Sequence, residues 1–208
     1  ALTITFAAPQ GDDLVLAQGA IGFDRPMVAI GAVDTPATSP CATVTPAAPL
    51  RWVWLGTTTL GFLSEAALPA ATEFTVEVGT ACKALDGSQL SAPYRYTFKT
   101  AAPRLAQTWP LANGSFVLAT DKLHLAFDQP IDPASLTDSL LVQSDGKTLA
   151  WQLVDGGQRP ESLRQERWAK AVPAQFAAIS VQGATPGSEI QLSLRPGLRS
   201  LLGPVAGK

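Results

Sequence analysis

Short runs in which apolar residues alternate with polar ones recur along the chain, and they constrain its fold more than any other feature. Alternation with a period of two places the apolar side chains on one face of a β-strand. The clearest runs are Leu60/Phe62, Phe74/Val76/Val78, Tyr94/Tyr96/Phe98, Leu123/Leu125/Phe127 and Ile190/Leu192/Leu194. Seventeen glycines and 17 prolines supply turns between such runs. The pattern predicts an all-β protein built as an antiparallel sandwich.

One stretch, residues 160–170, favours a helix instead. Pro160 stands where the first turn of a helix tolerates proline, and mostly good helix formers follow it. Leu163 and Trp168 are the apolar residues that would anchor this segment on the protein. We therefore expect one short surface helix in an otherwise β protein.

A weak internal repeat divides the chain in two. The segment 23–27, Phe-Asp-Arg-Pro-Met, is echoed 104 residues later by 127–131, Phe-Asp-Gln-Pro-Ile. The run Glu73–Val78 is echoed 116 residues later by Glu189–Leu194. Two tandem copies of one β unit explain both offsets if the second copy carries 12 extra residues, and the helical segment 160–170 is the natural insertion.

The boundary between the copies is expected near residues 99–103, where a strand ends and a proline interrupts pairing. The predicted domains are therefore 1–101 and 102–208. The first copy continues after Gly87 into a strong strand at 94–100, whereas five residues follow Gly203 in the second. We expect the second sandwich to lack its last strand, or to receive it from another segment, and the chain to be a fragment of a longer protein.

The charged and titratable residues indicate neither a catalytic site nor a binding site for metal, nucleic acid or membrane. Fifteen Lys and Arg against 17 Asp and Glu give a net charge of −2, with no positive excess to attract nucleic acid or an anionic membrane. A single histidine and two cysteines argue against a zinc site and against a His-based catalytic centre. His124 alternates with Leu123 and Leu125, which favours a surface or half-buried strand residue. We predict no catalytic, cofactor-binding or metal-binding residue.

Asp24 and Asp128 occupy matching turns, but neither lies in an Asp- or Asn-rich loop of the kind that gathers six or more oxygen ligands around calcium. Trp52 and Trp54 leave a second question open, because they flank Val53 and so share one face of a strand. Such a pair packs into a core or between domains more often than it forms a sugar-stacking platform. Burial of the two rings decides between these readings.

The cysteines, Cys41 and Cys82, have two possible roles. As a disulfide they would close a loop of about 40 residues and restrict the unfolded chain by about 4 kcal/mol. As free thiols they would be small buried apolar residues. Both lie in turn-flanked positions of the first copy, and the position that matches Cys82 in the second copy is Leu198.

Several separated blocks of the first copy occur in an order that resembles the bacterial Ig-like domain described in surface-layer proteins. The blocks are Phe23–Met27, Val44-Thr45-Pro46, Trp52–Gly56, Leu60-Gly61-Phe62, Leu68–Val78, Leu85-Asp86-Gly87 and Tyr96–Thr100. The wider context is similar to the N-terminal region of bacterial alpha-2-macroglobulin-like proteins. That context consists of Pro26–Gly31, then Phe127–Asp132 in the second copy, and Ser200–Pro204 near the end.

This resemblance implies two tandem antiparallel Ig-like sandwiches in an exported protein of the periplasm or cell surface. It also implies an oxidising compartment and hence a Cys41–Cys82 disulfide. The implied role is a non-catalytic structural or interaction module of a protease inhibitor. Its partners would be downstream domains of the same polypeptide and, through the parent protein, proteases; the chain itself is expected to be a monomer. No signal peptide stands at residues 1–6, which open as a strand.

The functional hallmarks of that family are a protease-cleaved bait segment and, in many members, a Cys-x-Glu-Gln thioester. Cys41 is followed by Ala-Thr-Val and Cys82 by Lys-Ala-Leu, so neither matches the thioester. No functional residue of the family carries over to this chain. The alternative from another class is an adhesin, surface-layer or carbohydrate-binding Ig-like module.

Overall fold

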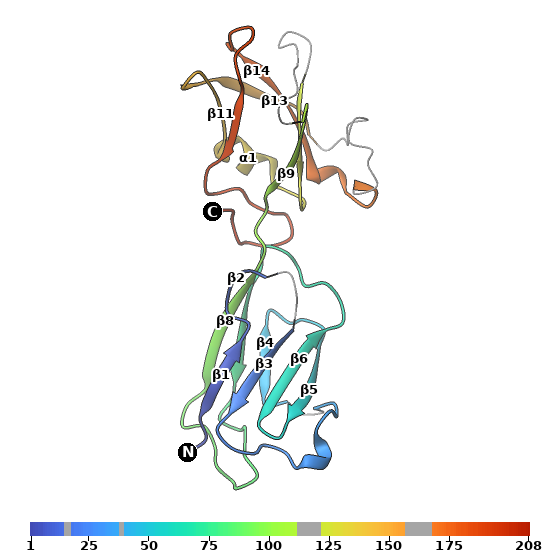
Figure 1. The fold of residues 1–208 in the computed structure, drawn as a ribbon, viewed down its shortest axis with the longest axis vertical. Helices are drawn as coiled ribbons and strands as arrows, with labels where there is room; N and C mark the ends of the chain where they lie inside the picture. Colours follow the sequence, from blue (N-terminus) through green and yellow to red (C-terminus); the bar gives the residue numbers. More distant parts are fainter. Residues whose placement is uncertain (15–17, 38–39, 112–121, 157–167) are drawn as a thin grey trace. The chain divides into compact units, whose positions relative to one another are not determined.

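The computed structural model describes residues 1–14, 18–37, 40–111, 122–156 and 168–208 (Figure 1). The chain splits into two compact units, Ala1–Ala101 (unit 1) and Ala102–Lys208 (unit 2). Each unit is built from mainly antiparallel sheets with a hydrophobic core between them, so the fold is the predicted all-β, Ig-like one. Among the described residues, no helix is both long and apolar enough to cross a membrane.

Unit 1 consists of two four-stranded sheets. The first has the order β1 (Ile4–Ala8), β3 (Gln18–Phe23), β6 (Thr59–Ser64), β5 (Leu50–Gly56). The second has the order β2 (Gly11–Leu14), β8 (Tyr94–Thr100), β7 (Glu73–Val78), β4 (Ala42–Thr45), with β2 parallel to β8. A short 3-10 turn, η1 (Ile30–Ala32), precedes β4.

Stacked aromatic rings join the two sheets of unit 1. Phe98 of β8 lies 5.2 Å from Phe74 of β7 and 6.4 Å from Phe62 of β6, measured between ring centroids. All three side chains are buried. The alternating apolar positions recognised in the sequence therefore point inward, which is the reason these segments form strands with one buried face.

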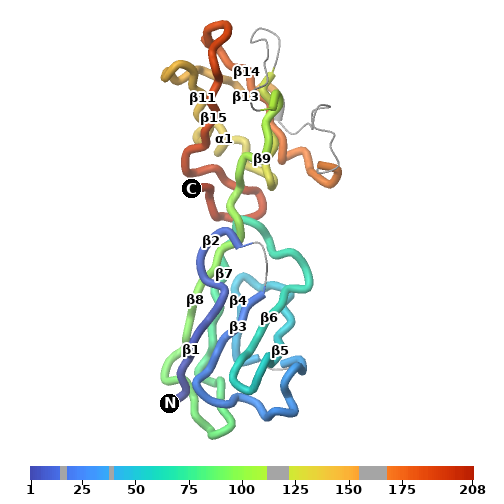
Figure 2. Tube along the Cα trace, viewed as in Figure 1, coloured from blue at the N-terminus to red at the C-terminus, as the bar shows by residue number. Residues whose placement is uncertain are grey.

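Unit 2 has a four-stranded and a three-stranded sheet. The first has the order β13 (Ala150–Gly156), β14 (Phe176–Gln182), β10 (Leu123–Phe127), β9 (Leu105–Trp109). The second has the order β12 (Lys147–Thr148), β11 (Leu140–Ser144), β15 (Gln191–Leu194). Figure 2 traces β11 and β15 side by side, and the core includes Leu125, Phe127 and Ile179.

The first sheets of the two units match strand by strand. In both, the strand that carries the Phe-Asp-x-Pro motif pairs with the first strand of the unit and with the later hairpin, as β3 does with β1 and β6, and β10 with β9 and β14. The proline carbonyl accepts a similar bond in each copy, from the amide of Leu85 to Pro26 at 2.9 Å and from Leu201 to Pro130 at 3.0 Å. The weak sequence repeat therefore reflects a structural duplication.

The extra residues of the second copy lie between β13 and β14. In unit 1 only Thr57 and Thr58 separate the corresponding strands β5 and β6, whereas β13 ends at Gly156 and β14 begins at Phe176. The predicted helix 160–170 falls in this interval, and its residues 160–167 are outside the described part of the chain. Its predicted anchor Trp168 is buried and packs against Phe176 at 5.7 Å between ring centroids.

A helix that the sequence analysis missed is α1 (Pro133–Ser139). The carboxylate of Asp132 accepts a hydrogen bond from the amide of Ala134 at 3.1 Å, and Pro133 occupies the first turn. Asp followed by Pro is a helix-start signal, but seven residues are too few to show helical periodicity. Leu136 anchors the helix in the core of unit 2.

Candidate functional site

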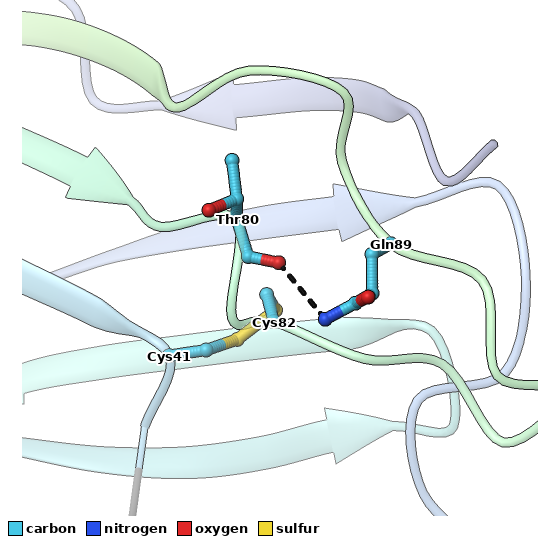
Figure 3. The surroundings of a disulfide bond; sticks show 4 residues. All are labelled: Cys41, Thr80, Cys82 and Gln89. Carbon is cyan, nitrogen blue, oxygen red and sulfur yellow. Dashed lines mark hydrogen bonds between the residues drawn. A yellow bond between two sulfur atoms is a disulfide. The ribbon is translucent and has the colours of Figure 1, made fainter.

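A disulfide joins Cys41 and Cys82 in unit 1, with the two Cα atoms 4.9 Å apart (Figure 3). Cys41 directly precedes β4 and Cys82 follows β7, its antiparallel partner. The amide of Gly79 donates to the Cys41 carbonyl at 3.0 Å, so the bridge closes the end of a strand pair that backbone bonds already hold. Cys82 is almost fully buried. The bond is therefore a structural staple set at the edge of the core.

The turn around the disulfide is tied further by side chains and backbone. The side-chain amide of Gln89 donates to the Thr80 carbonyl at 3.2 Å, as the dashed line in Figure 3 shows. The amide of Cys82 donates to Gly79 at 3.1 Å. In unit 2 the core position that matches Cys82 is held by Leu198, which is 1% exposed. The second copy thus uses an apolar side chain where the first uses a covalent bond.

A charged network joins the Phe-Asp-x-Pro turn of unit 1 to the turn at Asp86. Arg25 donates through Nη1 to Asp86 at 2.8 Å and to the Ser88 hydroxyl at 3.0 Å, and its Nη2 lies 3.2 Å from Asp24. The hydrogen bond from Arg25, together with the bond from the Thr3 amide, lowers the pKa of Asp24 to about 2. The amide and hydroxyl of Ser88, and then Arg25, lower the pKa of Asp86. Every member of this network is partly exposed.

These carboxylates are suited to holding turns and not to exchanging protons near neutral pH. A general acid or base works best with a pKa near the operating pH, and both pKa values are moved away from it. In unit 2 a different pair does the same work, since Arg199 lies 2.8 Å from Asp132 and lowers its pKa. The paired loops are therefore fastened in both units, with different residues.

The two tryptophans face the core. Trp52 lies 5.2 Å from Phe62 and Trp54 lies 6.3 Å from Phe23, measured between ring centroids. Both are half-buried and pack against the core of unit 1. Of the two readings left open by the sequence, this arrangement favours packing over an exposed sugar-stacking row.

His124 is half-buried in β10, opposite Ala178 and Trp109, as the alternation predicted. In the part of the chain that the structure describes, no three His, Cys, Asp or Glu side chains gather in a way that could hold a metal ion. The structure brings together the two cysteines and the two tryptophans as paired features of unit 1. The network around Arg25 was missed by sequence reasoning because its partners are 61 and 63 residues away.

No protein-family model matches the chain, and no curated protein matches it. Among solved structures it is similar to the native conformation of alpha-2-macroglobulin from E. coli, at 12% identity and a TM-score of 0.34, over 94% of this chain and 12% of that one. It is similar to an L,D-transpeptidase from Mycobacterium smegmatis at 10% identity and a TM-score of 0.34, over 96% and 76% of the two chains.

A further similar structure is L,D-transpeptidase 3 from Mycobacterium tuberculosis with a faropenem-derived adduct. It has 14% identity and a TM-score of 0.33 over 76% of this chain, which spans 48% of that structure's length. Likeness of this degree identifies neither a family nor an activity.

Proposed function

We propose that this chain is a non-catalytic structural module from the N-terminal region of a bacterial alpha-2-macroglobulin-like protease inhibitor of the periplasm. The observation that carries the proposal is the duplicated Ig-like unit. The prolines at matching positions in the two copies, Pro26 and Pro130, each accept an equivalent backbone hydrogen bond at their carbonyl. The ordered sequence blocks that resemble that family support it. The Cys41–Cys82 disulfide is typical of an exported protein, because such bonds persist in oxidising compartments.

The physical role of such a module is to hold other domains in position. Each unit buries a cluster of large apolar side chains in a core, and its turns are held by ion pairs and, in unit 1, by a covalent bond. The proposed partners are the downstream domains of the same polypeptide. The chain would contact proteases only as part of the full-length parent protein.

The experiment is to isolate the gene that encodes this chain and to assay its full product beside the chain alone. We expect the parent to contain a Cys-x-Glu-Gln sequence and to retain proteases after bait cleavage. The isolated chain should leave the same proteases fully active. A parent that continues as further copies of the same β unit, without that thioester sequence, would contradict the proposal and favour a surface-layer or adhesin protein.

The carbohydrate-binding alternative has its own test. The chain and its Trp52→Ala variant would be applied to a glycan array, with an exposed substitution such as Leu55→Ala as the matched control on the same strand. We expect no glycan to be bound by any of the three proteins. Binding that is lost in the Trp52 variant and kept in the control would replace the structural role by a lectin-like one.

A further inference from the structure

Among the described residues, strand β15 of unit 2 has one strand neighbour fewer than β7, its counterpart in unit 1. In unit 1, β7 lies between β4 and β8, whereas β15 pairs with β11 alone among the described residues. The two strands correspond residue by residue. Gly79, just after β7, donates to the Cys41 carbonyl at 3.0 Å, and Arg195, just after β15, donates to the Ser139 carbonyl at 2.8 Å.

The exposure of the inward side chains differs between β7 and β15 in the same sense. The inward residues of β7, Phe74, Val76 and Val78, are each 0% exposed. The corresponding residues of unit 2, Ile190, Leu192 and Leu194, pack against the core but stay half-exposed. Removing apolar surface from water is favourable, so the free energy of the protein falls if a further strand covers this edge.

The backbone of β15 is also oriented for pairing. Backbone N–H groups alternate between the two sides of a strand. The amide of Arg195 faces the β11 side, since it donates to Ser139. The amides of Leu192 and Leu194 therefore face the opposite edge of β15, on which no described strand lies.

The charge of Glu189 indicates the register in which an added strand would pair with β15. In unit 1, Glu73 begins β7 and lies 3.2 Å from Lys99, its direct cross-strand partner on β8. Glu189 holds the matching position in unit 2 and is exposed. A basic side chain on an added strand would stand opposite it, as Lys99 stands opposite Glu73.

We infer that the outer edge of β15 accepts one extended strand from a partner polypeptide that is not a second copy of this chain. The strand runs antiparallel to β15, with apolar side chains opposite Ile190, Leu192 and Leu194 and a basic side chain opposite Glu189. Unit 1 provides the template, since Phe98, Tyr96 and Tyr94 of β8 stand opposite Phe74, Val76 and Val78. This inference goes beyond the proposed function, because it depends on the geometry of unit 2 alone.

The residues that follow β15 to the end of the chain do not pair with it. Gly207 accepts from the amide of Gly197 at 3.0 Å and donates to the carbonyl of Leu198 at 2.8 Å. Both partners lie beyond the end of β15 at Leu194. The segment therefore closes the base of unit 2 without pairing with β15.

The test is a titration of the full chain, labelled with nitrogen-15, with a synthetic peptide of the sequence of residues 91–101. We expect saturable binding, and amide exchange at Leu192 and Leu194 slowed by about tenfold or more at saturation. The amides of Val76 and Val78 are the internal control, since β8 already covers that edge. A peptide with Tyr96→Ser and Phe98→Ser should not bind, because it lacks the inward side chains.

A charge exchange tests the register. Glu189→Lys should weaken binding of the peptide about two- to fivefold, and a peptide with Lys99→Glu should recover it. The inference is overturned if the peptide does not bind or leaves exchange at Leu192 and Leu194 unchanged. It is also overturned if the serine peptide binds equally well, or if the charge exchange has no effect. A chain that sediments as a dimer, with these amides protected without peptide, would assign the edge to a second copy instead.

Discussion

The backbone amide of Thr3 donates a 2.9 Å hydrogen bond to the carboxylate of Asp24, which ties the start of unit 1 to the turn after β3. Unit 2 repeats the bond between Arg104 and Asp128, also at 2.9 Å. The carbonyls of Thr3 and Arg104 in turn accept from the amides of Asp24 and Asp128 at 3.1 Å. The same reciprocal pair thus fixes the first strand of each unit.

Asp24 should make the stability of unit 1 depend on pH. Its pKa of about 2 in the folded chain lies below the ordinary value of 3.8, so its contribution is fully present above pH 3.8 and is lost as the pH falls towards 2. Carbon-13 NMR of the carboxyl group would measure the folded-state pKa directly. In Arg25→Met the pKa should rise towards 3.8, since the bond from Arg25 is the main cause of the shift. An unchanged pKa in that variant would contradict the assignment.

Removing the disulfide should destabilise unit 1. The double variant Cys41→Ala, Cys82→Ala releases a loop whose closure is worth about 4 kcal/mol on the loop-entropy model. Denaturant unfolding followed by amide exchange would locate the loss in residues 1–101. In the unsubstituted chain, mass spectrometry should find two free thiols only after reduction. Free thiols in the absence of reductant would refute the bond.

Phe98 should be among the most sensitive core positions. Phe98→Ala leaves a cavity between Phe62 and Phe74, and its cost should be about 3–5 kcal/mol of unfolding free energy. Phe6→Ala is a matched control, because that ring is 48% exposed. Its cost should stay below about 1 kcal/mol. Equal losses in the two variants would show that Phe98 does not link the sheets.

Trp52→Ala should lower stability by about 2 kcal/mol, roughly half the cost of truncating a fully buried tryptophan. The reason is that the ring is half-buried against Phe62. Thermal unfolding of the variant beside Leu55→Ala would measure it. A fully stable Trp52 variant would argue that the ring is free for another purpose.

Period-two alternation identified the strands because it reports directly on which face is buried. Leu125 and Phe127, marked by alternation, are both 0% exposed. The repeat also placed the extra residues of unit 2 in the interval between β13 and β14, because matched blocks on either side fixed the offset.

Long-range polar contacts could not be predicted in this way. Arg25 reaches Asp86 across 61 residues, and nothing in the local sequence of either one names the other. The sequence marks Asp24 and Asp128 as matching turn residues that lack a calcium-binding loop. Both carboxylates accept hydrogen bonds from backbone amides, those of Thr3 and Arg104, which every residue except proline can supply. Side-chain identity therefore carried no signal for these two bonds.

The pairing of β13 with β14 holds although their connection is far longer than the Thr57-Thr58 hairpin of unit 1. Lengthening a loop costs little free energy, about 0.6 kcal/mol per doubling. Unit 2 therefore tolerates changes in the length of the connection between β13 and β14. A protein engineer could graft a peptide epitope or a sensor element there, and natural variants of the chain can diversify at the same point while keeping both cores intact.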